Sequence, residues 1–168
     1  DEVEILINDF SSSILVPKAL LRRGLIEYNK NDTSAALKSF NAVALGYPST
    51  PEAFQAISSS RSIYIDLGQV DAYELWLKTL DYSEVNDSEL EAATYEAAEK
   101  KYLDANNSKA IELFNGYIAR FPKGKELLKA HFYLAELYYK NNLKPNALPH
   151  YNYVCKQATN EFTEAALL

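Results

Sequence analysis

The sequence predicts an all-α fold in which helical hairpins stack as repeats, and three observations predict it. A Tyr precedes an Ala by eight residues at four places along the chain. A large aromatic residue follows each of these Ala residues by four positions, and a small residue precedes each by twelve. The four frames recur at spacings of 36, 38 and 37 residues. Self-similarity at a period of 20–50 residues is typical of arrays in which each unit buries its apolar face against its neighbours.

Each frame predicts two helices, because residues four and seven apart lie on one helical face. The break between the helices falls in KNDTS, DLGQV, ANNS or NNLKPN, where Asn, Asp, Ser or Thr can cap the second helix. Small residues at the frame positions let the two helices approach within roughly 8–10 Å. The positions are the small residues Gly24, Ser60, Ala98 and Ala135; the tyrosines Tyr28, Tyr64, Tyr102 and Tyr139; the alanines Ala36, Ala72, Ala110 and Ala147; and the aromatics Phe40, Trp76, Phe114 and Tyr151.

The repeat boundaries follow from helix start and stop signals. Pro48 and Pro122 stop the preceding helices, Thr50 before Pro51 predicts a cap and a helix start, and Ser88 with Glu91 predicts a capping box. The whole chain 1–168 is predicted to be a single array, with the end of a preceding repeat in 1–16, four repeats at 17–50, 51–86, 87–124 and 125–160, and the start of a further repeat in 161–168.

Both ends are predicted to cut through repeats. Val3, Leu6 and Phe10 match the end of a second helix, and Phe162 to Leu168 start a first helix. The chain also begins with Asp and contains no Met, so we interpret it as a fragment of a longer protein. Truncated ends leave apolar residues without a covering helix, which predicts self-association at high concentration.

Composition narrows the function classes. The 168 residues are 48% hydrophobic and carry a net charge of −6, which argues against a nucleic-acid partner because phosphate binding needs clustered Lys and Arg. No apolar run reaches the roughly 18 residues that span a bilayer, so no membrane insertion is expected of these residues. The single Cys155 cannot form an internal disulfide.

A catalytic or metal constellation is not apparent. His150 and Cys155 are five residues apart, about 140° around a helix, so they cannot readily meet. His131 is expected to stand alone near the start of a first helix, and Glu96 and Glu99 share a face without a nearby His. No phosphate-binding glycine loop is present. The sequence therefore predicts a protein that is not an enzyme and holds neither cofactor nor metal.

The motif of a small residue, a Tyr, a polar turn, an Ala, an aromatic residue and then Pro resembles the tetratricopeptide repeat. It runs through Gly24, Tyr28, Ala36, Phe40 and Pro48, and again through Ala98, Tyr102, Ala110, Phe114 and Pro122. The resemblance spans about residues 17–159 and implies a right-handed α-α superhelix. The second repeat departs most, because Ser60, Trp76 and Glu84 replace the usual residues and Gly68 comes one position late in its turn.

The family resemblance implies a concave groove, lined by the first helices, that binds a protein or peptide segment. Basic residues in the first two repeats and acidic residues in the last two predict a partner with acidic and basic ends around an apolar centre. Leu25, Arg61, Glu99 and Glu136 at the aligned groove positions argue against docking of a chaperone's C-terminal carboxylate. The predicted groove residues are Lys18, Arg22, Leu25, Arg61, Tyr64, Tyr95, Glu99, Tyr102, Tyr133, Glu136 and Tyr139.

The closing turns YPSTPEA and RFPKGKELLKAHFYLAELYY are similar to those of bacterial cell-envelope members of the family, of the outer-membrane assembly lipoprotein and Tol-Pal-associated division coordinator type. This resemblance implies a scaffold in an envelope-associated complex, in the periplasm or at the outer membrane, with the cytoplasm as the alternative location. A structural spacer or self-assembly module without a groove ligand is the alternative function.

Overall fold

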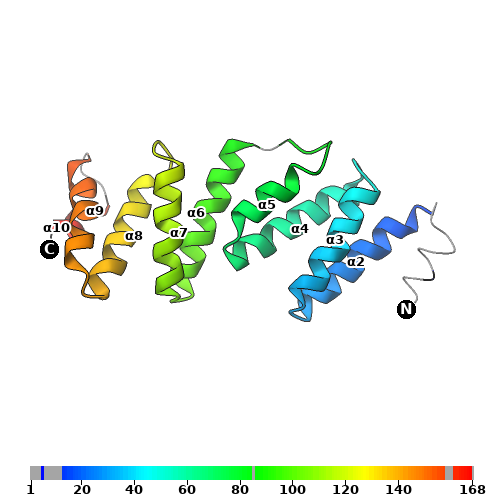
Figure 1. Cartoon of the computed structure of the whole chain (residues 1–168), viewed down its shortest axis with the longest axis horizontal. Coiled ribbons are helices and arrows are strands. Elements are labelled where there is room, and N and C mark those ends of the chain that lie inside the picture. Colours follow the sequence, from blue (N-terminus) through cyan, green and yellow to red (C-terminus); the bar gives the residue numbers. More distant parts are fainter. Residues whose placement is uncertain (1–4, 6–12, 85, 158–160, 168) are drawn as a thin grey trace. The chain divides into compact units, whose positions relative to one another are not determined.

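The computed structural model describes residues 5, 13–84, 86–157 and 161–167, and every regular element among them is an α-helix (Figure 1). This confirms the predicted all-α class with tetratricopeptide-like helical hairpins. The helices are α2 (Leu15–Asn29), α3 (Thr33–Gly46), α4 (Pro51–Leu67), α5 (Val70–Leu77), α6 (Asp87–Leu103), α7 (Asn107–Arg120), α8 (Leu127–Lys140), α9 (Lys144–Lys156) and α10 (Thr163–Leu167).

The chain divides into two compact units, each with its own core. The first unit comprises Asp1–Tyr64 and Asp71–Val85, and the second comprises Ile65–Val70 and Asn86–Leu168. In the first unit the fully buried Phe40 packs with Val16, Leu20 and Ile63. The second core gathers around Phe114 and Tyr117, with Leu134 and Leu137 from α8. Each core therefore draws on the aromatic and aliphatic positions that the repeat frame selects.

The small residues of the frame lie where the helices of a hairpin cross. Gly24, Ser60, Ala98 and Ala135 are all buried, as the frame predicts. The need for a small side chain is most severe at Gly24, where a Cβ atom would lie 2.5 Å from Cε1 of Phe40. The Phe40 ring therefore packs directly against the backbone of Gly24, in the space that a side chain would fill.

The turns within the hairpins explain where the frame fails. Asn31, Ala105 and Asn142 have positive φ angles of 61°, 56° and 58°, and each comes three residues after the frame Tyr. In the second hairpin the left-handed residue is Gly68, with φ of 68°, and it comes four residues after Tyr64. The turn is one residue longer, so the register of the following helix shifts by one.

The predicted role of Ala72 is consequently wrong, because this residue is exposed. In the other three hairpins the buried Ala lies five residues after the left-handed residue, at Ala36, Ala110 and Ala147. Five residues after Gly68 is Tyr73, which is 1% exposed. A buried Tyr thus stands on α5 where the other three hairpins have a buried Ala.

Side-chain caps begin several helices. Asp32 Oδ1 accepts a hydrogen bond from the Ala35 amide at 2.9 Å, and Asn106 accepts one from the Lys109 amide at 3.3 Å. Thr50 Oγ1 accepts from the Ala53 amide at 3.2 Å, which confirms the predicted start of α4. Pro145 lies in the first turn of α9, where its fixed φ angle suits the start of a helix.

The predicted capping box of Ser88 and Glu91 is wrong. The cap of α6 is Asn86, whose side chain accepts a hydrogen bond from the Ser88 amide at 2.9 Å, and the helix begins at Asp87. The Glu91 carboxylate instead faces α7 and the loop after it, where it accepts hydrogen bonds from the Tyr117 hydroxyl and the Lys125 amide.

The flanks of the array are described only in part. Val3, Leu6, Phe10 and Leu168 lie outside the described residues, so the predictions made for them stay predictions. Thr163–Leu167 form the short helix α10, and Leu167 is exposed. Among the described residues, none of the helices combines the length and the apolar character that crossing a bilayer requires.

Candidate protein-interaction site

A surface hollow between α2 and α4 of the first unit brings three of the predicted groove residues together. Its volume is ≈ 260 Å³. Lys18, Arg22 and Leu25 come from α2, where spacings of four and three residues place them on one face. The full lining is Lys18, Leu21, Arg22, Leu25, Pro51, Glu52 and Gln55.

This hollow joins an apolar floor to a charged rim. Leu21 is buried and Leu25 half-buried, whereas the side chains of Lys18 and Arg22 are exposed. Glu52 and Gln55 on α4 were not among the predicted groove residues. Their spacing of three residues at the start of α4 places both on one face of that helix, and the structure turns this face toward α2.

The two predicted groove residues on α4 lie away from this hollow. Arg61 is half-buried, and Tyr64 packs against Tyr73 and Trp76 with ring centroids 5.9 and 6.3 Å apart. Burial raises the pKa of the Tyr64 hydroxyl. Tyr64 and Trp76 instead line a second hollow of ≈ 360 Å³ together with Asn41, whose side-chain oxygen accepts a hydrogen bond from Trp76 Nε1 at 2.7 Å.

In the second unit, Tyr102 and Tyr133 form the centre of an aromatic face. Their rings stack with centroids 4.7 Å apart and planes inclined by 23°. The Lys140 ammonium lies 5.7 Å from the centroid of Tyr102, close enough for a cation–π interaction. Both tyrosines are half-buried, so this face combines packing within the unit with partial access to solvent.

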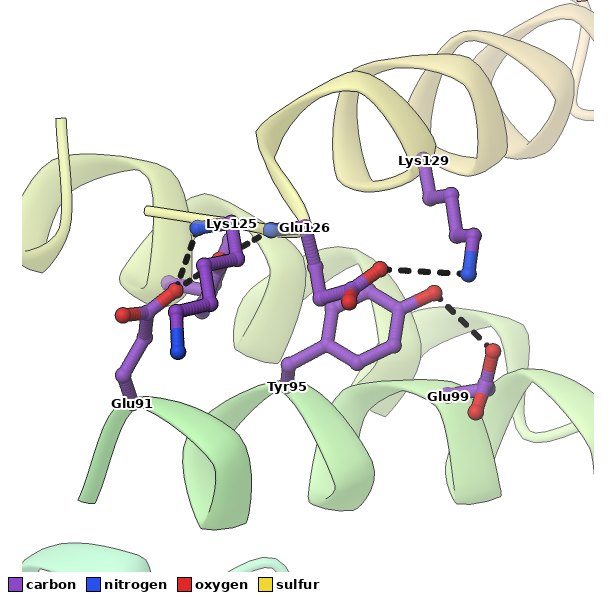
Figure 2. Close-up of polar contacts among 7 residues, drawn as sticks. Glu91, Tyr95, Glu99, Lys125, Glu126 and Lys129 are labelled. Carbon is purple, nitrogen blue, oxygen red and sulfur yellow. Dashed lines mark hydrogen bonds and ion pairs between the residues drawn. The ribbon is translucent and has the colours of Figure 1, made fainter. Parts of the chain in front are cut away.

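Tyr95 is part of the core rather than of a surface. It is 6% exposed, and its hydroxyl donates a hydrogen bond to Glu99 at 2.9 Å, as Figure 2 shows. Burial, followed by the hydrogen bond to Glu99, raises the pKa of Tyr95 well above its ordinary value. Of Tyr95 and Glu99, both predicted groove residues, Glu99 is the one that remains partly exposed to solvent.

Glu136 and Tyr139, the last predicted groove residues, also have partners within the unit. Glu136 accepts a hydrogen bond from the Tyr151 hydroxyl at 2.6 Å and forms an ion pair with Lys140 at 3.8 Å. Tyr139 is exposed, and the Lys144 ammonium lies 5.4 Å from its ring centroid. The charge of Glu136, at the predicted acidic end of the groove, is thus offset in part by Lys140.

A polar network fixes the loop between α7 and α8. Glu91 accepts a hydrogen bond from the Lys125 amide (Figure 2). Glu91 also accepts one from the Tyr117 hydroxyl at 3.0 Å, and this hydroxyl accepts one from the Glu126 amide at 3.0 Å. Burial raises the pKa of Tyr117 to about 12. Gly124 makes room for this network, since a Cβ atom there would lie 2.4 Å from the Tyr117 hydroxyl.

The expectation that His131 stands alone is wrong. Its Nδ1 lies 2.9 Å from Nδ1 of His150, on the second helix of the same hairpin. Burial, and then the neighbouring His150, lower the pKa of His131 to about 4, and burial lowers that of His150 as well. Within the part of the chain that the structure describes, no group of three or more His, Cys, Asp and Glu side chains gathers as a metal site would.

Comparison with known proteins bears on the first hairpin. Residues 18–50, which include most of α2 and all of α3, match the family model described as tetratricopeptide repeat. No curated protein and no solved structure gives a significant match to the chain. Tetratricopeptide repeats are generally protein-interaction modules. The match supports membership of the tetratricopeptide repeat family for the segment that forms the α2–α3 hairpin and contributes Lys18, Arg22 and Leu25 to the hollow.

Proposed function

We propose that this chain is a non-catalytic protein-interaction scaffold that holds a segment of a partner protein in the hollow between α2 and α4. The observation that carries the proposal is the lining of that hollow, where exposed Lys18 and Arg22 stand over the apolar Leu21 and Leu25. Apolar area supplies binding energy, and the rim charges supply specificity and association rate. A segment with an acidic side chain next to an apolar one fits this arrangement.

The finer predictions from the sequence belong to the same proposal. The aromatic face around Tyr102 and Tyr133, with Glu99, Glu136 and Tyr139 beside it, is proposed as a second contact region in the second unit. Arg61 and Tyr64 stay predicted contacts of the first unit. The similarity of the closing turns to envelope proteins is the basis for proposing an envelope-associated complex.

Charge reversal in the hollow tests the proposal. Partners captured from the source organism by the wild-type chain are compared with those captured by the double variant Lys18→Glu/Arg22→Glu. Lys30→Glu/Lys156→Glu is the matched control, because both lysines are exposed, neither lines the hollow, and the change in net charge is the same. We expect the first variant alone to lose the partner, with the loss growing smaller as salt is added.

Two results contradict the proposal. Equal recovery by all three proteins, after far-UV circular dichroism shows that each is folded, removes the hollow from the binding model. Recovery of no protein except the chain itself, with a mass that rises with concentration, favours the self-assembly module instead.

A further inference from the structure

The second hollow of the first unit, between α3, α4 and α5, has the lining of a ligand site. Its volume of ≈ 360 Å³ lies within the roughly 300–1,000 Å³ of pockets that hold small molecules. This α3–α5 hollow shares no lining residue with the hollow between α2 and α4, so it is a separate surface. It is lined by Ser34, Leu37, Lys38 and Asn41 from α3, by Ser60 and Tyr64 from α4, and by Trp76 from α5.

The most deeply buried residue of this lining is Ser60, which is 1% exposed. Its hydroxyl has no hydrogen-bond partner among the residues that the structure describes. Such a hydroxyl lowers stability, because it loses its hydrogen bonds to water when the chain folds. The other three hairpins have Gly24, Ala98 and Ala135 at the same frame position. Packing of the helices therefore explains the small size of Ser60 but not its hydroxyl, which a polar atom bound in the hollow would satisfy.

Asn41 adds a hydrogen-bond donor whose orientation is fixed. The Trp76 Nε1–H can only donate, so the atom of Asn41 that faces it at 2.7 Å is the side-chain oxygen. The two N–H groups of the Asn41 amide are left for other acceptors. The same hydrogen bond holds the Trp76 indole in the wall of the hollow.

The α3–α5 hollow also has aromatic walls and a positive rim. The rings of Tyr64 and Trp76, with centroids 6.3 Å apart, are both half-buried and keep part of their surface accessible. Lys38 is exposed, and none of the described residues that line the hollow is an Asp or a Glu. An occupant with a planar apolar ring and a negatively charged acceptor group matches both features.

We propose that the α3–α5 hollow binds a small molecule that carries an aromatic ring and a carboxylate. The ring lies against Tyr64 and Trp76. The carboxylate accepts hydrogen bonds from the Ser60 hydroxyl and the Asn41 amide, and Lys38 supplies the opposite charge. This site goes beyond the proposed function, because it takes a different class of ligand in a different hollow.

The emission of Trp76, the single tryptophan, reports on occupancy of the hollow that it lines. The whole chain is titrated with sodium 3-phenylpropionate to about 10 mM, since ligands of this size typically bind in roughly the millimolar range. Two control compounds each lack one feature: 3-phenylpropanamide has no charge, and propionate has no ring. We expect saturable binding of 3-phenylpropionate and affinities lower by about 10-fold or more for both controls. The absence of a saturable change in emission, or equal affinities for all three compounds, overturns the proposal.

Two variants separate binding from packing. Asn41→Asp keeps the oxygen that accepts from Trp76 but replaces the N–H donors with a negative charge, so we expect an affinity lower by about 10-fold or more. Ser60→Ala removes the unpaired hydroxyl, so we expect a higher urea midpoint together with an affinity lower by about 10-fold. Ser62→Ala, at an exposed position of α4, is the matched control and should leave the affinity unchanged.

Two further results overturn the proposal. One is a Ser60→Ala variant that binds 3-phenylpropionate as tightly as the wild type, whatever its stability. The other is tighter binding of the peptide acetyl-Gly-Phe-Glu-Gly-amide than of 3-phenylpropionate, which would indicate a protein segment as the ligand. If Asn41→Asp does not fold, the three compounds compared on the wild type decide.

Discussion

Replacing Gly24 by Ala adds one methyl group where α2 crosses α3. That methyl carbon would lie 2.5 and 2.7 Å from Cε1 and Cδ1 of Phe40, whose side chain is fully buried. Ordinary carbon–carbon contacts are about 3.5–4.0 Å, so the ring must move by about 1 Å in a packed core. Overpacking of this kind typically costs about 1–3 kcal/mol.

The same substitution has an intrinsic benefit that must be subtracted. Alanine in a helix interior is more stable than glycine by about 0.5–1 kcal/mol. Since the displacement at Phe40 is large, we expect Gly24→Ala to lower the free energy of unfolding by about 1–2.5 kcal/mol after both effects. Gly116, inside α7, is the matched control, because nothing lies within 4 Å of its added Cβ. Gly116→Ala should therefore gain about 0.5–1 kcal/mol.

Urea unfolding separates these two outcomes. Trp76 is the single tryptophan and lies in the first unit with Gly24, so its fluorescence follows that unit, while far-UV circular dichroism follows all helices. The reasoning is refuted if Gly24→Ala unfolds at the same or a higher urea concentration than the wild type. It is also refuted if the two glycine variants shift the midpoint in the same direction by similar amounts.

Three further predictions concern the second unit. The pKa of His131 is about 4 in the folded chain and 6.5 ordinarily, so the unfolded chain binds more protons than the folded chain between these pH values. The free energy of unfolding should therefore be constant above pH 6.5 and fall by roughly 1–3 kcal/mol toward pH 4. Urea midpoints that do not change over that range would contradict this. Gly124→Ala should destabilise by about 1–3 kcal/mol and increase amide hydrogen exchange at Lys125 and Glu126, because its Cβ displaces the Tyr117 hydroxyl; unchanged exchange there would argue against the network. Ala105→Asn should raise the thermal midpoint, with a gain of about 0.5–1 kcal/mol, because Asn tolerates the φ of 56° that Ala105 adopts; a lower midpoint would contradict the role assigned to this turn.

The repeat frame could be predicted from the sequence because it rests on spacing alone. The small residues at the crossings and three of the four alanines are buried as predicted. The prediction that Ala72 is buried failed because Gly68 makes one turn a residue longer, and a shift of one residue rotates the positions on a helix by about 100°. The late position of Gly68 is visible in the sequence. Its effect on the register of α5 could be recognised only once the positive φ angles showed which residue is left-handed in each of the other turns.

The histidine pair was missed although its signal was available. Ala135 and Ala147 mark where α8 and α9 cross, and His131 lies four residues before the first while His150 lies three residues after the second. In an antiparallel hairpin these offsets lead to the same end of the pair. Helical angles within α9 alone, which separated His150 from Cys155, could not reveal a partner on the facing helix.

The surface of the first unit was predicted in part. Lys18, Arg22 and Leu25 share a face of α2 by spacing, and the hollow contains all three. Glu52 and Gln55 complete it from α4. Which face of α4 meets α2 depends on the crossing of the two helices, and the periodicity of α4 does not contain that information.

The most direct test of the proposed function places a photo-crosslinking amino acid at Gln55, in the hollow, and in a second protein at Leu75 on α5. Both side chains are exposed in the first unit, so both positions tolerate a bulky residue, and only Gln55 lines the hollow. After irradiation with the captured partner, mass spectrometry identifies the crosslinked peptides. The proposal predicts crosslinks from position 55 to one acidic and apolar segment of the partner, abolished by Lys18→Glu/Arg22→Glu, and none from position 75. Crosslinks from position 75 alone, or equal crosslinks from both positions that survive the charge reversal, would contradict it.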